Sequence, residues 1–191
     1  MKKELEFDVS ADEKIGLGLL NNHVHFLFGE IDEENIEDCI KWIVYENVIP
    51  SPTPKVLTLY INSVGGSLND SFALIDVMKN SHCPIRVIGI GSVVSAAFLI
   101  FSAGTKGERY IAKNTSIMCH QYSDSYEGKH HDIKSRYRES ELTNTRMIDI
   151  LKENTGLDAR TIKSKLLCPT DVWLTAEELI EFGIADDIFK T

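Results

Sequence analysis

Three apolar runs, each followed by a helix-forming segment, restrict the fold of this chain more than any other feature. The runs cover residues 24–29, 56–61 and 84–90, and helices are expected over 32–47, from 68 to about 78, and from 95 to about 102. Continuous apolar strands are typical of parallel sheets, and strand–helix alternation joins parallel strands by right-handed crossovers. The sequence therefore predicts an α/β domain with a mostly parallel sheet.

Shorter elements complete the expected domain. Strands are expected at 109–111 and 116–119, and a capping box over 175–178 opens a last helix that Gly183 closes. Residues 1–20 are polar, with weak periodicity, which indicates a flexible or partner-dependent N-terminal segment. Residues 21–191 are predicted to form a single domain.

One long segment does not fit a compact domain. Residues 130–154 are highly charged and favour a helix, with few apolar positions, among them Ile133, Tyr137 and Met147. So thin an apolar stripe predicts an arm that projects from its own domain and packs against another subunit. An ordinary surface helix is the alternative. The domain would then consist of a head, residues 21–121 and 170–191, and an arm of about 122–169.

Composition excludes several classes of function. The 191 residues are 43% hydrophobic and 26% charged, as in ordinary soluble proteins, and the net charge is −9. This charge disfavours binding to nucleic acid or to an anionic membrane surface. No apolar run approaches the ~20 residues that span a bilayer, and the N-terminus lacks the apolar region of a signal peptide. Four widely spaced cysteines favour free thiols in the cytoplasm.

Polar and small residues gather where the predicted strands end, which is where α/β domains place their functional sites. Gly65 and Gly66 follow one strand, Ser95 lies between another strand and a helix, and His120 closes a third. A serine at a helix start has unpaired backbone N–H groups beside it, which could stabilise an oxyanion. It could also be a simple helix cap.

A serine nucleophile needs a base and a carboxylate that orients the base. His120 and Asp171 could fill these roles, although a histidine at a strand end is often structural and Asp171 could be a turn residue. Ser92 is a second candidate nucleophile, but it precedes the turn. Sequence separation alone does not bring these side chains together.

Five motifs, in order, resemble those of the proteolytic subunit of the Clp protease, a self-compartmentalising serine peptidase. The resemblance covers roughly residues 22–188. Its motifs are the double-glycine strand at 60–66, the nucleophile turn at 91–97, the segment after the nucleophile helix at 102–107, the histidine strand at 117–121, and the aspartate loop and terminal helix at 171–186.

The resemblance implies a fold of the Clp-protease and crotonase type, with repeated β-β-α units and a projecting arm helix. It implies Ser95 as nucleophile, His120 as general base and then acid, and Asp171 as orienting carboxylate. The backbone N–H groups of Gly66 and Ala96 would form the oxyanion hole. The subunit would assemble into a heptameric ring, single or double, and degrade peptides and unfolded chains fed by an AAA+ Clp unfoldase. ATP would be used only by that partner, and the chain itself needs no cofactor.

The chain departs from the family pattern near the cleft and in the aspartate loop. Ala96 and Ala97 replace the usual Met-Gly, and Val64 and Tyr122 replace prolines. Residues 169–170, Pro-Thr, stand where the family has an Asp-Arg pair that docks two rings, so ring–ring docking is expected to be altered.

Other functions stay open as alternatives. A catalytically silent ring subunit would share the same sequence pattern, and a crotonase-like acyl-CoA enzyme would share the oxyanion hole, although no basic patch for CoA phosphates is evident. His23 and His25 alternate on a strand and could bind a metal, but no third ligand is apparent. Gly65-Gly66 lacks the Gly-Lys-Ser/Thr ending of a phosphate-binding loop, so no ATP binding is expected.

Overall fold

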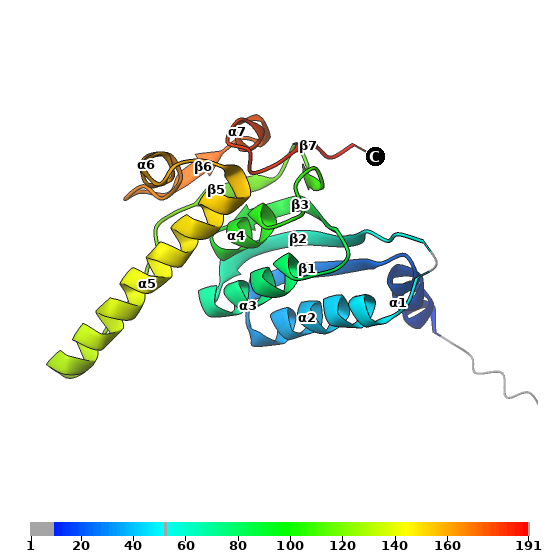
Figure 1. Cartoon of the computed structure of the whole chain (residues 1–191), viewed down its shortest axis with the longest axis horizontal. Helices are drawn as coiled ribbons and strands as arrows, with labels where there is room; N and C mark the ends of the chain where they lie inside the picture. Colours follow the sequence, from blue (N-terminus) through cyan, green and yellow to red (C-terminus); the bar gives the residue numbers. More distant parts are fainter. Residues whose placement is uncertain (1–9, 52, 191) are drawn as a thin grey trace, which may run out of the picture.

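The structure, a computed structural model, describes residues 10–51 and 53–190 (Figure 1). Its helices are α1 (Ala11–Asn21), α2 (Glu33–Val48), α3 (Leu68–Lys79), α4 (Ala96–Ser102), α5 (His130–Thr155), α6 (Ala159–Thr161) and α7 (Ala176–Glu181), with a π-helical turn over Ile162–Leu166. Its strands are β1 (Val24–Ile31), β2 (Leu57–Gly66), β3 (Ile85–Val94), β4 (Arg109–Ile111), β5 (Ser116–Cys119), β6 (Val172–Leu174) and β7 (Asp187–Ile188).

The strands of the described residues form one mixed sheet, which confirms the predicted α/β class. Strands β1, β2, β3, β4 and β7 lie side by side in that order, and every pairing among them is parallel. Beyond β4, the end of β3 also pairs in parallel with β5, and β6 adds to β5 in the antiparallel direction. The carboxyl ends of β2, β3 and β5 therefore meet in one region.

Helix caps explain why the helices begin where they do. Asp32 and Ser67 accept hydrogen bonds from backbone N–H groups at the starts of α2 and α3, and Thr175 forms the predicted capping box of α7. Ser10 and Glu13 form a second capping box, which begins α1 inside the segment that the sequence suggested to be flexible. The part of that segment from residue 10 onward is thus helical, and residues 1–9 lie outside the described residues.

The core lies between the sheet and the helices α2, α3 and α4, which cover one face (Figure 1). Every side chain of α4 is buried. In β2 the burial alternates, because Leu59 faces these helices while Tyr60 points to the opposite face and stacks on Phe26. A continuous apolar run is typical of a parallel strand that is covered on both faces. In the single chain, however, the second face of the sheet stays partly open, with Phe26 and Phe28 about 40% exposed.

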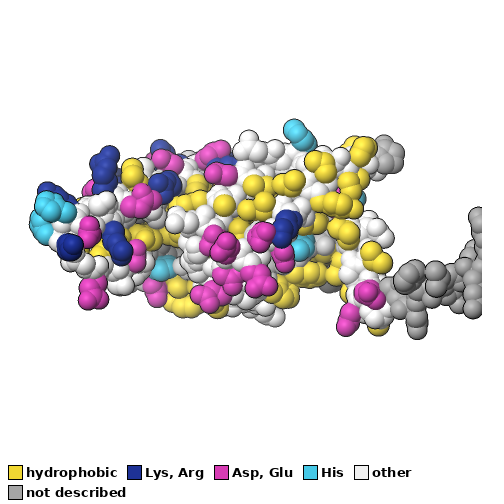
Figure 2. Space-filling view, turned by 90° about the horizontal axis from the view of Figure 1, so that it is seen from below, with side chains coloured by type: hydrophobic (Ala, Val, Ile, Leu, Met, Phe, Trp, Pro, Cys, Tyr) yellow, Lys and Arg dark blue, Asp and Glu magenta, His cyan; other side chains and the backbone are white. Residues whose placement is uncertain are grey.

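Helix α5 extends away from the sheet as the predicted arm (Figure 1). Its buried residues, Thr143, Met147, Ile148 and Leu151, all lie in its C-terminal half. The other half exposes Ile133, Tyr137 and Leu142 to solvent. In Figure 2 most of the Lys and Arg side chains lie toward the arm, whereas Asp and Glu side chains are spread over both the arm and the head. Among the described helices, none combines the length and the apolar character needed to cross a bilayer.

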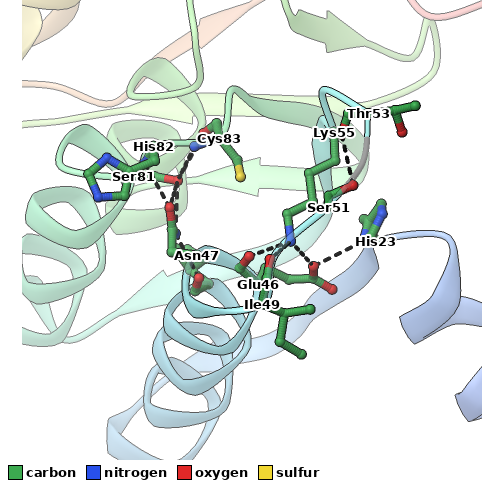
Figure 3. A network of polar contacts seen from close by, with 11 residues as sticks. His23, Glu46, Asn47, Ile49, Ser51, Thr53, Lys55, Ser81, His82 and Cys83 are labelled. Atoms are coloured by element: carbon green, nitrogen blue, oxygen red, sulfur yellow. Dashed lines mark hydrogen bonds and ion pairs between the residues drawn. The ribbon is translucent and has the colours of Figure 1, made fainter.

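Two buried ion pairs hold the edges of the head. Arg109 is fully buried and forms two side-chain hydrogen bonds with Asp186, at 2.9 and 2.6 Å. At the other edge, Glu46 at the end of α2 is buried against Lys55, whose Nζ lies 3.0 Å from its carboxylate (Figure 3). Lys55 also donates to the backbone carbonyls of Glu46 and Ile49, so it caps the C-terminus of α2.

Candidate active site

Ser95 is the single residue between β3 and α4, and its backbone is strained. Its φ is 57° and its ψ is −120°, a conformation that residues with a Cβ rarely adopt. Such strain costs about 1–3 kcal/mol and persists only where the surroundings impose it. The Ser95 side chain makes no capping hydrogen bond, so the alternative of a simple helix cap is wrong. Its hydroxyl is instead free to meet another side chain.

The Ser95 hydroxyl meets the side chain of His120, the residue that follows β5. Strands β3 and β5 pair with Val94 opposite Met118, and the Ser95 N–H donates to the Met118 carbonyl at 2.9 Å. This register brings the Ser95 Oγ to 2.6 Å from the His120 Nε2. A hydroxyl hydrogen-bonded to an imidazole nitrogen is the arrangement in which the base can take the hydroxyl proton.

Asp171 lies beside this pair without joining it. In the antiparallel pairing of β5 and β6, Cys119 is opposite Val172, so the same register places His120 opposite Asp171. His120 and Asp171 line one cavity of about 490 Å³. Among the described residues, however, no hydrogen bond joins the two side chains, and Asp171 is exposed. The structure therefore brings together two of the three residues suggested by the sequence and places the third next to them.

The double glycine brings the end of β2 against the nucleophile. At Gly65, where φ is +95°, a Cβ would lie 2.7 Å from the Ser95 Cβ and 3.0 Å from the Ala96 nitrogen. At Gly66 a Cβ would collide with the backbone of Ile31 in β1. Only glycine permits both approaches. The Ala96 N–H lies in the first turn of α4, where backbone N–H groups have no partner within the helix.

A cavity of about 320 Å³ opens beside these groups. It is lined by Ser95, His120, Gly66 and Ala96, and both polar and apolar side chains form the rest of its wall. That wall is made by Ser67, Leu68, Asn69, Gln121, Tyr122, Ser123, Asp124, Glu139, Thr143 and Met147. The arm helix α5 thus contributes to the cleft.

The other histidine and serine candidates lie elsewhere. His23 precedes β1 and lies 2.9 Å from the Glu46 carboxylate, whereas the His25 ring stacks on Trp42, and burial lowers the pKa of His25. No group of three or more metal-ligating side chains occurs in the described part of the chain. Ser92 lies before the end of β3, three residues from the turn.

Two residues at the end of β2 were missed in the sequence. The Asn62 Oδ1 accepts a hydrogen bond from the Ser92 N–H at 3.0 Å, and the Ser63 Oγ accepts one from the Gly65 N–H at 3.1 Å. Both positions lie just before Val64 and the double glycine, and polar residues near the end of a buried strand were the signal that could have found them.

Comparison with known proteins agrees with a peptidase of this architecture. The sequence model of the family described as Clp protease matches residues 10–191. The chain is also 32% identical, over 173 residues, to the ATP-dependent Clp protease proteolytic subunit 1 of Corynebacterium jeikeium (strain K411). That alignment covers 91% of this chain and 90% of the relative. The chain therefore belongs to the Clp protease family and is a peptidase subunit.

Proposed function

We propose that this chain is a serine endopeptidase in which Ser95 is the nucleophile, His120 the general base and then acid, and Asp171 the residue that orients the imidazole. The observation that carries the proposal is the 2.6 Å hydrogen bond between the Ser95 Oγ and the His120 Nε2. The strained backbone of Ser95 supports it, because strain of this kind gathers at functional residues.

In the proposed reaction the Ser95 Oγ attacks the carbonyl carbon of a peptide bond while its proton passes to the His120 Nε2. The backbone N–H groups of Gly66 and Ala96 donate to the oxyanion that forms. The C–N bond then breaks, His120 gives its proton to the leaving amine, and an acyl-enzyme remains on Ser95. Water, deprotonated by His120, hydrolyses this ester and regenerates the hydroxyl.

We propose that a local change lets Asp171 complete the relay. It lies opposite His120 in the register of β5 and β6, and its carboxylate is exposed rather than bound elsewhere. We propose that it accepts a hydrogen bond from the His120 Nδ1–H when bound substrate or a neighbouring subunit shifts the segment that carries it. The present separation also leaves a second function in view, that of a catalytically silent ring subunit.

The family implies a chamber built from several copies, and two surfaces of this chain suit it. The arm exposes Ile133, Tyr137 and Leu142, and the open face of the sheet exposes Phe26 and Phe28. We propose that copies form a heptameric ring, single or double, which an AAA+ Clp unfoldase supplies with unfolded chains. ATP is then used by that partner alone. The four free cysteines favour the reducing cytoplasm as its location.

The decisive experiment changes the nucleophile. Ser95→Ala should lower turnover of a fluorogenic peptide on the order of 10⁶-fold, by analogy with other triads. Ser116→Ala, at an exposed position in β5, is the matched control and should keep wild-type turnover. A fluorophosphonate should label wild type at Ser95, as located by mass mapping on material sized by native mass spectrometry. Full activity of Ser95→Ala would refute the proposal, and no labelling of an assembled ring would favour the silent subunit.

A further inference from the structure

The end of β3 carries an irregularity that determines where the nucleophile lies. Ile61 of β2 is paired with Gly89 of β3, and Ser63 is paired with Val93. Between these pairs β2 advances by two residues, from 61 to 63, while β3 advances by four, from 89 to 93. Two extra residues therefore bulge out of β3 opposite Asn62, and a bulge of this kind redirects the strand that follows it.

The Asn62 side chain fills the place that the bulge leaves in the ladder. The Ser92 N–H, displaced from regular pairing, donates to the Asn62 Oδ1 at 3.0 Å. Gly91 in the same bulge has a φ of +61°, and a Cβ there would lie 2.5 Å from the Asn62 Oδ1. The amide is thus packed directly against the bulged backbone and supplies the acceptor that one of its N–H groups needs.

Asn62 and its neighbour connect the two halves of the proposed site. Beyond the bulge, β3 pairs with β2 again at Val93. The strand then ends at Val94, immediately before Ser95. On β2, the buried Ser63 hydroxyl accepts from the Gly65 N–H and so holds the strand that leads to Gly66. The same short stretch of β2 fixes the path to the nucleophile and the path to one oxyanion donor.

From this geometry we infer that Asn62 is a positioning residue, which holds the bulge of β3 so that Ser95 keeps its distance from the Gly66 N–H. The inference rests on the proposed roles of Ser95 and Gly66. Asn62 lines neither of the cavities that contain His120, so it acts through Ser95 rather than on the substrate. A displacement of the reacting atoms by about 1 Å can lower turnover by up to 10²-fold. Peptide binding should change little, because Asn62 does not line the cleft.

The test compares Asn62→Ala, which removes the acceptor, with Asn62→Asp, which keeps an oxygen at the same place. Thr115→Val is the matched control, because it removes a different side-chain hydrogen bond to β3, at 3.1 Å to the Gly89 carbonyl, outside the bulge. For each full-length variant, kcat and KM are measured with a fluorogenic peptide. The rate and the final extent of fluorophosphonate labelling at Ser95 are measured on the same samples.

We expect Asn62→Ala to lower kcat and the labelling rate by about 10- to 100-fold with little change in KM. Labelling should still reach one per chain, which distinguishes a misplaced nucleophile from a loss of folded protein. Asn62→Asp should restore most of the rate, and Thr115→Val should behave as wild type. The inference is overturned if Asn62→Ala reacts at the wild-type rate, if its final labelling falls in step with its rate, or if Asn62→Asp is equally slow. Wild type that is not labelled at Ser95 would instead refute the proposed function.

Discussion

The contact between the double glycine and the nucleophile can be tested by adding a single methyl group. In Gly65→Ala the new Cβ would lie 2.7 Å from the Ser95 Cβ, whereas ordinary van der Waals contact begins near 3.4 Å. The end of β2 and the Ser95 turn must therefore separate by about 0.7 Å. An oxyanion donor at a typical distance of about 2.9 Å would move to about 3.6 Å, beyond hydrogen-bonding range. Loss of one such donor lowers kcat by about 10²–10³-fold.

Gly107→Ala separates this effect from backbone strain. Gly107 has a φ of +89°, close to that of Gly65, but a Cβ there meets nothing within 4 Å. Gly107→Ala should lose about 1–2 kcal/mol of unfolding free energy from the left-handed backbone, measured by urea denaturation, and Gly65→Ala should lose more because its Cβ also collides with the Ser95 turn. Only Gly65→Ala should lose turnover of a fluorogenic peptide. Equal kcat in the two variants would show that the close approach does not set the geometry of the oxyanion hole.

Two further predictions concern stability. Lys55→Met removes the lysine charge from the buried Glu46, leaves only His23 beside that carboxylate, and should cost about 3–5 kcal/mol of unfolding free energy. Lys41→Met, at an exposed pair on α2, should change nothing measurable in the same urea titration. Burial alone would raise the pKa of Asp186, but the hydrogen bonds and charge of Arg109 outweigh it and hold that pKa below its usual value. The pair therefore stabilises the fold above the unfolded-state pKa, near 4, and is lost as pH falls through the lower folded value. Asp186→Asn should remove this part of the acid sensitivity in unfolding curves at pH 7 and pH 3, and an unchanged profile would contradict the assignment.

The main elements of the fold were predictable because their signals are local. Apolar runs mark β1, β2 and β3, and the capping box at Thr175 marks the start of α7. The helix at α1 was missed, since its capping box begins a segment with no buried side chain and hence no apolar pattern to read. The open face of β2 was also missed, because a continuous apolar run looks the same whether one face or both are covered by the same chain.

The sequence by itself determined which residue types end the central strands, and with them the candidates Ser95 and His120, and its aspartate-loop motif supplied the candidate Asp171. It could not determine the distances among them. The parallel register of β3 with β5 decided that Ser95 meets His120, and the antiparallel register of β5 with β6 placed Asp171 opposite His120 without a hydrogen bond between their side chains. Register depends on pairing between segments far apart in the chain, and a slip of one residue would turn each of these side chains to the opposite face of the sheet.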